Sequence, residues 1–171
     1  MERELLLLGL LRQQDMHGYQ LHEFIDRTMQ TCVDIKKSTA YYLLDKMAQQ
    51  GWIVQTEERE GNRPPRQVYS LTPEGETQFH ELLRQNLAMY TPARFTNDVG
   101  LTFLDELPPS EAVALLQQRR ADLVAISTRI EQTPPHAGAL QYLIDHQIAH
   151  LSAELNWLDA LISRLENQAE S

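Results

Sequence analysis

The chain has 171 residues, of which 42% are hydrophobic and 23% are charged, an ordinary composition for one globular domain or two small ones. Its net charge of −9 argues against a protein that coats nucleic acid indiscriminately. The longest apolar run, Leu5 to Leu8, is far too short to cross a membrane, and the single cysteine, Cys32, excludes a disulfide within the chain. We therefore expect a cytoplasmic protein.

Two helices are predicted in the first 30 residues. The stretch Glu2 to Gln14 is apolar nearly all round, so we expect it to be covered on several sides, including by something outside its own small domain. Asp15 can cap the second helix. The apolar positions of that helix keep a 3.6-residue period and are Leu21, Phe24, Ile25 and Met29.

A third helix and a hairpin are predicted between Lys36 and Leu71. The buried face of the helix consists of Ala40, Leu43, Leu44 and Met47. Gly51 fits the left-handed position that ends a helix. Strands are expected from Trp52 and from Gln67, and the turn between them carries Arg59, Arg63 and Arg66. A helix followed by a basic hairpin is the winged-helix layout, in which the helix enters a DNA major groove and the hairpin touches the backbone or minor groove.

Charge is distributed unevenly along the chain. Residues 36–73 contain six Lys or Arg and four Asp or Glu, whereas the remainder contains nine basic and twenty acidic residues. A locally basic element on an acidic body is typical of a protein with a restricted, salt-sensitive nucleic-acid footprint.

The second half of the chain is predicted to be helical. Thr72-Pro73 is a typical helix start, and Pro92 ends that helix. A further helix is expected from Ser110 to Pro134, with Ser110 as its cap, and a long one from about Ala137 to Asn167. We therefore predict a mainly α protein with a small β-hairpin: a winged-helix DNA-binding domain at 1–92 and a helical dimerisation and effector domain at 93–171.

The last predicted helix carries apolar residues at alternating spacings of four and three. They are Ile144, Ile148, Leu151, Leu155, Leu158, Ile162 and Leu165. Such a seam packs either in a bundle core or against a second copy of the chain. We favour the second copy, because no other predicted element is long enough to cover it. The predicted dimer interface is Leu5, Leu8, Ile148, Leu151, Leu155, Leu158 and Ile162.

Three stretches match a known pattern. The opening is similar to LLGLL…HGYEL through Leu5 to Leu11, His17, Gly18, Tyr19 and Leu21. The third predicted helix is similar to GTLYPLLxRLExxGLI through Thr39, Tyr41, Leu43, Leu44, Lys46, Gly51 and Ile53. The hairpin and the following helix are similar to PRKYYxLTxxG through Pro64, Pro65, Arg66, Tyr69, Leu71, Thr72 and Gly75. In combination, over about residues 4–80, they resemble the PadR family of bacterial transcriptional regulators.

This resemblance implies a dimeric, sequence-specific DNA-binding regulator, a repressor by analogy with the family's namesake, that binds a palindromic operator. The DNA-contacting residues that we predict are Lys36, Lys37, Ser38, Thr39, Tyr41, Tyr42, Lys46, Arg63 and Arg66. The chain departs from the family pattern at Ser38, Tyr42, Ala48 and Gln67, where the family has Gly, Pro, Glu and Lys. Gln67 lies in the hairpin, which is the wing of the winged-helix layout. Because Gln67 stands where the family has lysine, one phosphate contact is missing, and the recognised DNA sequence is expected to be unusual.

An effector pocket is predicted between the two domains, because an aromatic wall with hydrogen-bond donors is typical of small-ligand sites. Its residues are Tyr90, His146, His150 and Trp157. The resemblance makes an aromatic acid the first ligand to test. The alternative, which we consider slightly stronger, is a buried Trp157 and solvated histidines.

No catalytic or metal site is predicted. The pair His146 and His150 has the HxxxH spacing, but Gln147 replaces the Glu that acts as general base in zinc proteases, and no third ligand is evident. No phosphate-binding glycine motif is present. We expect neither a cofactor nor an enzyme. The alternative function is a winged-helix module that binds a protein and leaves DNA alone, which the net charge and Gln67 favour.

Overall fold

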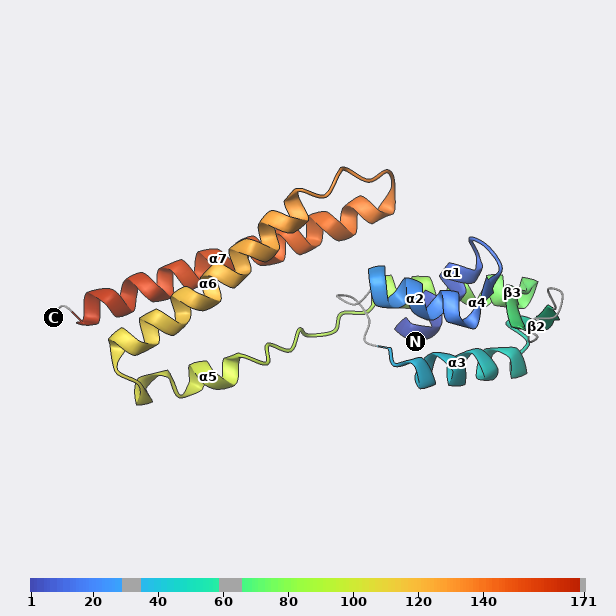
Figure 1. Ribbon diagram of the computed structural model, residues 1–171, viewed down its shortest axis with the longest axis horizontal. Coiled ribbons are helices and arrows are strands. Elements are labelled where there is room, and N and C mark those ends of the chain that lie inside the picture. The colour runs from blue at the N-terminus through green and yellow to red at the C-terminus, as the bar shows by residue number, and fades with distance from the viewer. Residues whose placement is uncertain (29–34, 59–65, 170–171) are drawn as a thin grey trace. The chain divides into compact units, whose positions relative to one another are not determined.

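The structure, a computed structural model, describes residues 1–28, 35–58 and 66–169 (Figure 1). The chain divides into two compact units, Met1–Pro92 and Ala93–Ser171. No helix in the described ranges is long and apolar enough to span a bilayer.

The N-terminal unit contains four helices and a three-stranded antiparallel sheet within its described residues. The helices are α1 (Glu2–Leu11), α2 (Gly18–Thr28), α3 (Lys37–Gln49) and α4 (Pro73–Ala88). The strands are β1 (Met16–His17), β2 (Ile53–Glu58) and β3 (Arg66–Leu71), in the order β1-β3-β2. The predicted hairpin of β2 and β3 is confirmed, with Ile53 opposite Leu71 and Glu58 opposite Arg66.

The strand β1 was not predicted. Its two residues pair with β3, so that Met16 lies opposite Tyr69 and His17 opposite Val68. The first helix consequently ends at Leu11, earlier than the expected Gln14, and α2 begins only after β1.

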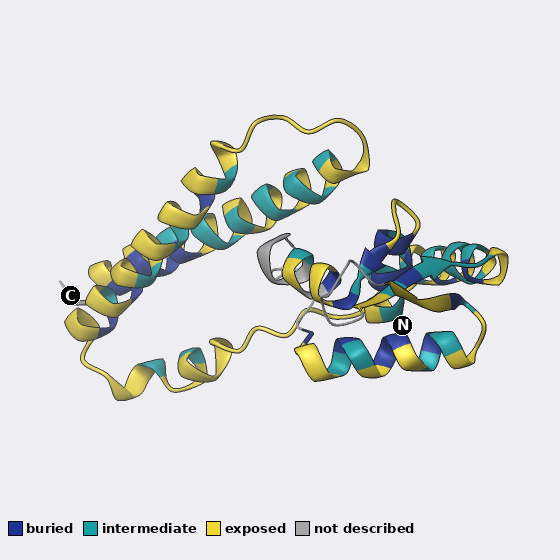
Figure 2. Cartoon of the chain, turned by 45° about the vertical axis from the view of Figure 1, so that its right-hand side comes forward, coloured by how far each residue is buried: buried dark blue, intermediate teal, exposed yellow. Residues whose placement is uncertain are grey.

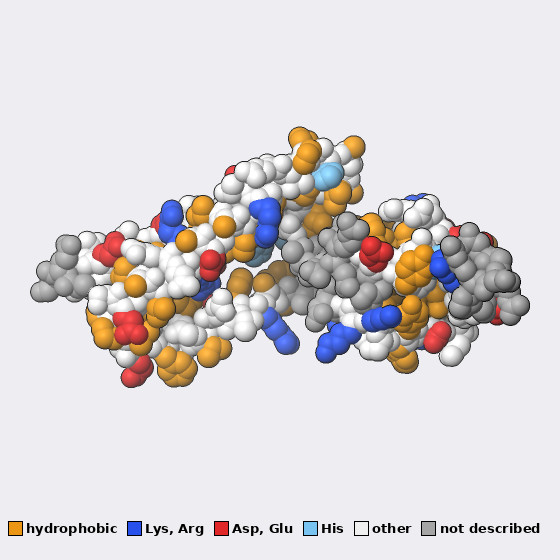
Figure 3. Space-filling model, viewed as in Figure 1, with side chains coloured by type: hydrophobic (Ala, Val, Ile, Leu, Met, Phe, Trp, Pro, Cys, Tyr) orange, Lys and Arg blue, Asp and Glu red, His pale blue; other side chains and the backbone are white. Residues whose placement is uncertain are grey.

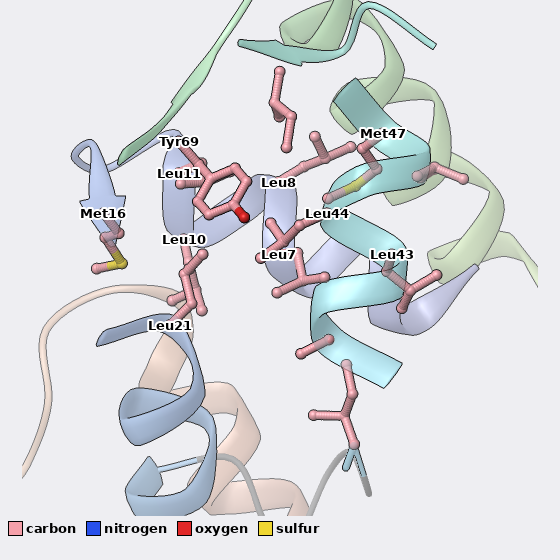
Figure 4. Packing of buried hydrophobic residues seen from close by; sticks show 14 residues of the cluster. Leu7, Leu8, Leu10, Leu11, Met16, Leu21, Leu43, Leu44, Met47 and Tyr69 are labelled. Atoms are coloured by element: carbon pink, nitrogen blue, oxygen red, sulfur yellow. The ribbon is translucent and has the colours of Figure 1, made fainter. Parts of the chain in front are cut away.

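The core of the N-terminal unit forms where α1, α2, α3 and the sheet meet. Leu7, Leu8, Leu21 and Leu44 are fully buried, and the ring of Tyr69 points from β3 into the same cluster (Figure 4). We expected α1 to need cover from outside its own unit. That was wrong for four of its leucines, because α1 contacts α3, α4 and β3 and has Leu7, Leu8, Leu10 and Leu11 buried there.

The predicted end of α3 and start of α4 meet at one joint. Gly51 follows α3 with φ of +75°, the left-handed conformation expected of it. Thr72 caps α4: its hydroxyl accepts the N–H of Gly75 at 3.0 Å and donates to the Gly51 carbonyl at 2.7 Å. The same residue's N–H donates to the Trp52 carbonyl at 3.1 Å. These hydrogen bonds fasten the first turn of α4 to the chain between α3 and β2.

The C-terminal unit is an antiparallel pair of long helices with a short helical segment beside it (Figure 1). The pair is α6 (Pro109–Glu131) and α7 (Ala139–Ala169), preceded by α5 (Asp98–Thr102) and a 3₁₀ turn, Leu104–Glu106. Ser110 was predicted to cap α6, but the cap position is Pro108 and Ser110 lies inside the helix. Pro108 is extended, with a ψ of 138°, and Pro109 takes the first helical position, so the helix begins two residues earlier than predicted.

The apolar seam of α7 is covered within the same chain. Leu158, Ile162 and Leu165 are buried against Ala112 and Leu116 of α6. We predicted that nothing else was long enough to cover this seam, which was wrong, because α6 has 23 residues. The burial of Leu158 and Ile162, like that of Leu8 in the other unit, leaves almost no surface for a second copy to contact. Leu5, Ile148, Leu151 and Leu155 remain half-buried.

Residues 89–97 join the two units without helix or strand. Every residue of this segment is exposed (Figure 2).

Candidate nucleic-acid interface

Helix α3 has one buried face and one exposed face. The buried face contains the predicted residues Ala40, Leu43, Leu44 and Met47, which pack into the core. The opposite stripe consists of Ser38, Tyr42, Asp45 and Gln49, all of them exposed (Figure 2). Because these residues recur at spacings of four and three, they line one side of the helix. The ring of Tyr42 is 66% exposed, so its hydroxyl is free to meet a partner molecule.

The N-terminal end of α3 is the basic end of that face. Lys36 and Lys37 are exposed beside Ser38, and Figure 3 shows Lys and Arg side chains over this end of the helix. Thr39, the next predicted residue, is half-buried. Among the residues that the structure describes, no side chain caps the first turn, whose unpaired backbone N–H groups form the positive end of the helix dipole. This arrangement attracts phosphate.

Lys46 is tied to α1. Its ammonium donates to the carboxylate of Glu4 at 3.0 Å, and this hydrogen bond raises the pKa of Lys46 above its ordinary value of 10.5. A contact from Lys46 to DNA would therefore have to compete with an existing ion pair, whereas no ion pair of Lys36 or Lys37 is found within residues 1–28, 35–58 and 66–169.

Tyr41 serves the fold at least as much as the surface. Its half-buried ring packs against Gly18, where a Cβ would lie only 2.6 Å from Cε1 of Tyr41. Glycine at this position therefore lets the start of α2 approach α3 closely.

The wing is the hairpin of β2 and β3. Arg66 is exposed on it, at the start of β3. Its guanidinium carbon lies 5.7 Å from the centre of the Tyr19 ring. The same ring stacks on His17 at 5.5 Å with an interplanar angle of 12°. The predicted Arg63 lies outside the described residues.

The C-terminal unit contains a cavity of about 580 Å³. Phe95, Leu123 and Leu151 form part of its apolar lining, and Arg119 and His150 contribute polar groups. Arg119 also forms an ion pair with Glu154, which lines the cavity too.

The four predicted effector residues are not all in this cavity, which includes His150 alone among them. The rings of His146 and His150 meet edge to face at 5.4 Å, while Trp157 is 42% exposed beneath Arg119. The alternative of a buried Trp157 was therefore wrong, although both histidines are exposed as it supposed. Tyr90 belongs to the N-terminal unit, so its share in such a site stays a prediction.

Metal ligation has no support in the part of the chain that the structure describes: no three His, Cys, Asp or Glu side chains there could hold an ion together.

Comparison with known proteins places this fold. Residues 7–81, which include α3 and the wing, match the Transcriptional regulator PadR-like family. The negative transcriptional regulator PadR of Bacillus subtilis is 20% identical over 94% of this chain and 95% of its own length. Residues 7–81 therefore carry the sequence pattern of the PadR-like family, and the similarity to the Bacillus subtilis protein runs along nearly the whole chain. The family and this relative are both described as transcriptional regulators.

Solved structures extend the likeness of this PadR-like chain to both units. The crystal structure of Bacillus subtilis PadR in complex with operator DNA has a TM-score of 0.80 at 18% identity, covering 95% of this chain and 98% of that one. The complex of the same protein with p-coumaric acid has a TM-score of 0.73 at 18% identity, covering 95% and 94%. The predicted winged-helix fold with a helical C-terminal part is thereby confirmed.

Two residues that lie beside the wing, His17 and Tyr19, were not among our predicted DNA contacts. They belong to the HGY motif that first marked the family, but the motif alone does not say what the side chains touch. The place of Tyr19 beneath Arg66 and of His17 against Tyr19 depends on the pairing of β1 with β3, two segments about 50 residues apart.

Proposed function

We propose that this protein is a cytoplasmic, dimeric transcriptional repressor that binds a palindromic operator through α3 and the wing. The observation that carries the proposal is the exposed face of α3. It presents Lys36, Lys37, Ser38 and Tyr42 outward, while the opposite face fixes the helix to the core. A helix held in this way can enter a major groove without losing its packing.

Charge supports the same assignment. Phosphate contacts supply most of the affinity of such proteins and make it salt-dependent. Lys36 and Lys37 offer two cations at the start of α3, and Arg66 offers a third on the wing. The exposed Tyr42 and Ser38 carry hydroxyls, which can meet base edges or phosphates. The operator-bound crystal structure of the Bacillus subtilis relative, with a similar fold, gives further support.

The wing contact is tested with Arg66→Ala. We expect a loss of about 1–3 kcal/mol of operator binding and a salt slope smaller by about one. Binding to DNA from the protein's own promoter region is measured by fluorescence anisotropy at two salt concentrations. Arg84→Ala is the matched control, because Arg84 is an exposed arginine of α4 outside the proposed face. Equal affinities for the two variants would reject the wing contact.

The dimer is proposed to use the half-buried residues of the predicted interface: Leu5, Ile148, Leu151 and Leu155. Leu155→Glu places a carboxylate in that surface and should cost several kcal/mol of association, because a buried unpaired charge is unfavourable. Sedimentation at micromolar concentration measures the effect. Ser163→Glu, at an exposed position of the same helix, should leave the dimer intact. A monomeric wild-type protein would refute the dimer.

We further propose that a small aromatic effector binds to the C-terminal unit and thereby makes the protein release its DNA. The support is the cavity of about 580 Å³, a size typical of small-ligand sites, with Phe95 and His150 in its lining. The relative's complex with p-coumaric acid makes that acid the first ligand to titrate. Operator release that persists in His150→Ala and Phe95→Ala variants would place the effector elsewhere.

The alternative is a winged-helix module that binds a protein. The net charge of −9 and Gln67 favour it. Failure of the wild-type protein to bind its promoter DNA, even at low salt where phosphate contacts are strongest, would favour this alternative.

A further inference from the structure

Tyr19 lies where the wing meets the start of α2. Its ring is 46% exposed, in the first turn of the helix. The guanidinium of Arg66 lies over the ring at 5.7 Å, and the ring of His17 stacks on it at 5.5 Å. Arg66 and His17 thus share one aromatic platform.

The two residues before Tyr19 are held in place by contacts with the sheet and with α3. His17 pairs with β3, and its Nδ1 lies 3.3 Å from the Gln67 carbonyl, in reach of a hydrogen bond. Its backbone N–H donates to the side chain of Gln20 at 2.8 Å. The next residue, Gly18, packs directly against the Tyr41 ring of α3. Tyr19 therefore directly follows two residues that contact the strand β3 and the helix α3.

The contact with Tyr19 leaves Arg66 able to bind DNA. A guanidinium carries five N–H donors around its edge, so contact with a single aromatic ring leaves donors free for another partner. Arg66 can therefore rest on Tyr19 and donate to a phosphate at the same time. Because a free arginine has many rotamers, a side chain held before binding loses less entropy when the complex forms.

We propose that Tyr19 is a positioning residue that holds Arg66 of the wing ready for DNA. This inference rests on the proposed function, since it requires that Arg66 contacts DNA. It assigns to Tyr19 an effect on affinity that acts through Arg66 and through its ring, not through its hydroxyl.

A double-mutant cycle on the full-length protein tests the coupling. Tyr19→Leu should weaken binding to the promoter fragment by about two- to fivefold, the range of an exposed cation–π contact. In an Arg66→Ala background the same change should have no further effect. Tyr19→Phe keeps the ring and should bind like the wild type. Circular dichroism confirms that each variant is folded.

A second measurement does not depend on DNA. Protons above an aromatic ring are shifted upfield, so the Nε–H resonance of Arg66 should move downfield in Tyr19→Leu and stay in place in Tyr19→Phe. A resonance unchanged in Tyr19→Leu would overturn the proposed contact in solution.

The outcomes separate this inference from the function on which it rests. Arg66→Ala binding like the wild type would remove the wing contact itself and the positioning role with it. If Arg66→Ala loses affinity for DNA as expected, two results would overturn only the positioning role. One is that Tyr19→Leu has no effect on affinity, and the other is that its effect persists in the Arg66→Ala background. Equal losses in Tyr19→Phe and Tyr19→Leu would assign the effect to a direct contact of the hydroxyl and overturn it also.

Discussion

Replacing Gly75 by alanine tests the joint that holds α4 to the rest of the N-terminal unit. A Cβ built at Gly75 would lie 1.9 Å from the backbone oxygen of Trp52 and 2.7 Å from Cδ1 of Leu71. The leucine end can turn away, but the carbonyl belongs to the backbone at the start of β2. The first turn of α4 would therefore have to move by about 1 Å to restore an ordinary contact distance.

Such a shift strains the hydrogen bonds that fasten the turn. The cap of Thr72 on the Gly75 N–H contributes about 1 kcal/mol, and the bond from the Thr72 N–H to the Trp52 carbonyl contributes about the same. Overpacking adds about 1–3 kcal/mol. Alanine's better helix propensity returns at most about 1 kcal/mol. We expect Gly75→Ala to lower the free energy of unfolding by about 2–4 kcal/mol.

Urea unfolding followed by Trp52 emission measures this cost, with Trp157→Phe as the background so that one tryptophan reports. Gly9→Ala is the matched control within the same unit. Its Cβ would meet only the edge of the Phe79 ring, at 3.2 Å, and a ring can yield by a few tenths of an ångström. That variant should lose less than about 1 kcal/mol. If both variants unfold at the same urea concentration, the steric reasoning is wrong.

Three further outcomes are expected. Leu158→Ala should cost the C-terminal unit about 2–5 kcal/mol in urea unfolding, and the exposed Leu140→Ala much less. The hydrogen bond from Arg120 lowers the pKa of Asp159 below its ordinary 3.8, so Asp159 stabilises the fold above that pH and loses this effect as pH falls through the lowered value. Wild-type and Asp159→Asn melting temperatures should therefore differ at neutral pH and converge in acid. Burial raises the pKa of Tyr69 above 10.0, so the difference spectrum against Tyr69→Phe should show late ionisation.

Features set by neighbouring residues could be predicted from the sequence. The 3.6-residue period identified the buried face of α3, including Leu44 and Met47, which have no exposed surface. Likewise, Thr72 caps α4 and Gly51 ends α3, because cap chemistry depends on a few adjacent residues.

Features set by distant residues could not be predicted. Two residues form a strand at β1 only because β3 lies beside them, and no pattern of so few residues distinguishes a strand from a loop. The period of α7 identified its apolar face but not the helix that covers it. Similarly, nothing near Lys46 in the sequence indicates that Glu4, 42 residues earlier, pairs with its ammonium.

The exposed segment 89–97 is a place where a protease can cut the chain between its two units. Proteases need about eight residues of extended, accessible backbone, and this segment, which contains Tyr90 and Arg94, has neither helix nor strand to resist them. Brief trypsin treatment should therefore cut after Arg94 before it cuts within α6 or α7. The two pieces could then be purified apart, and the N-terminal one, residues 1–94, would be a convenient sample for heteronuclear NMR.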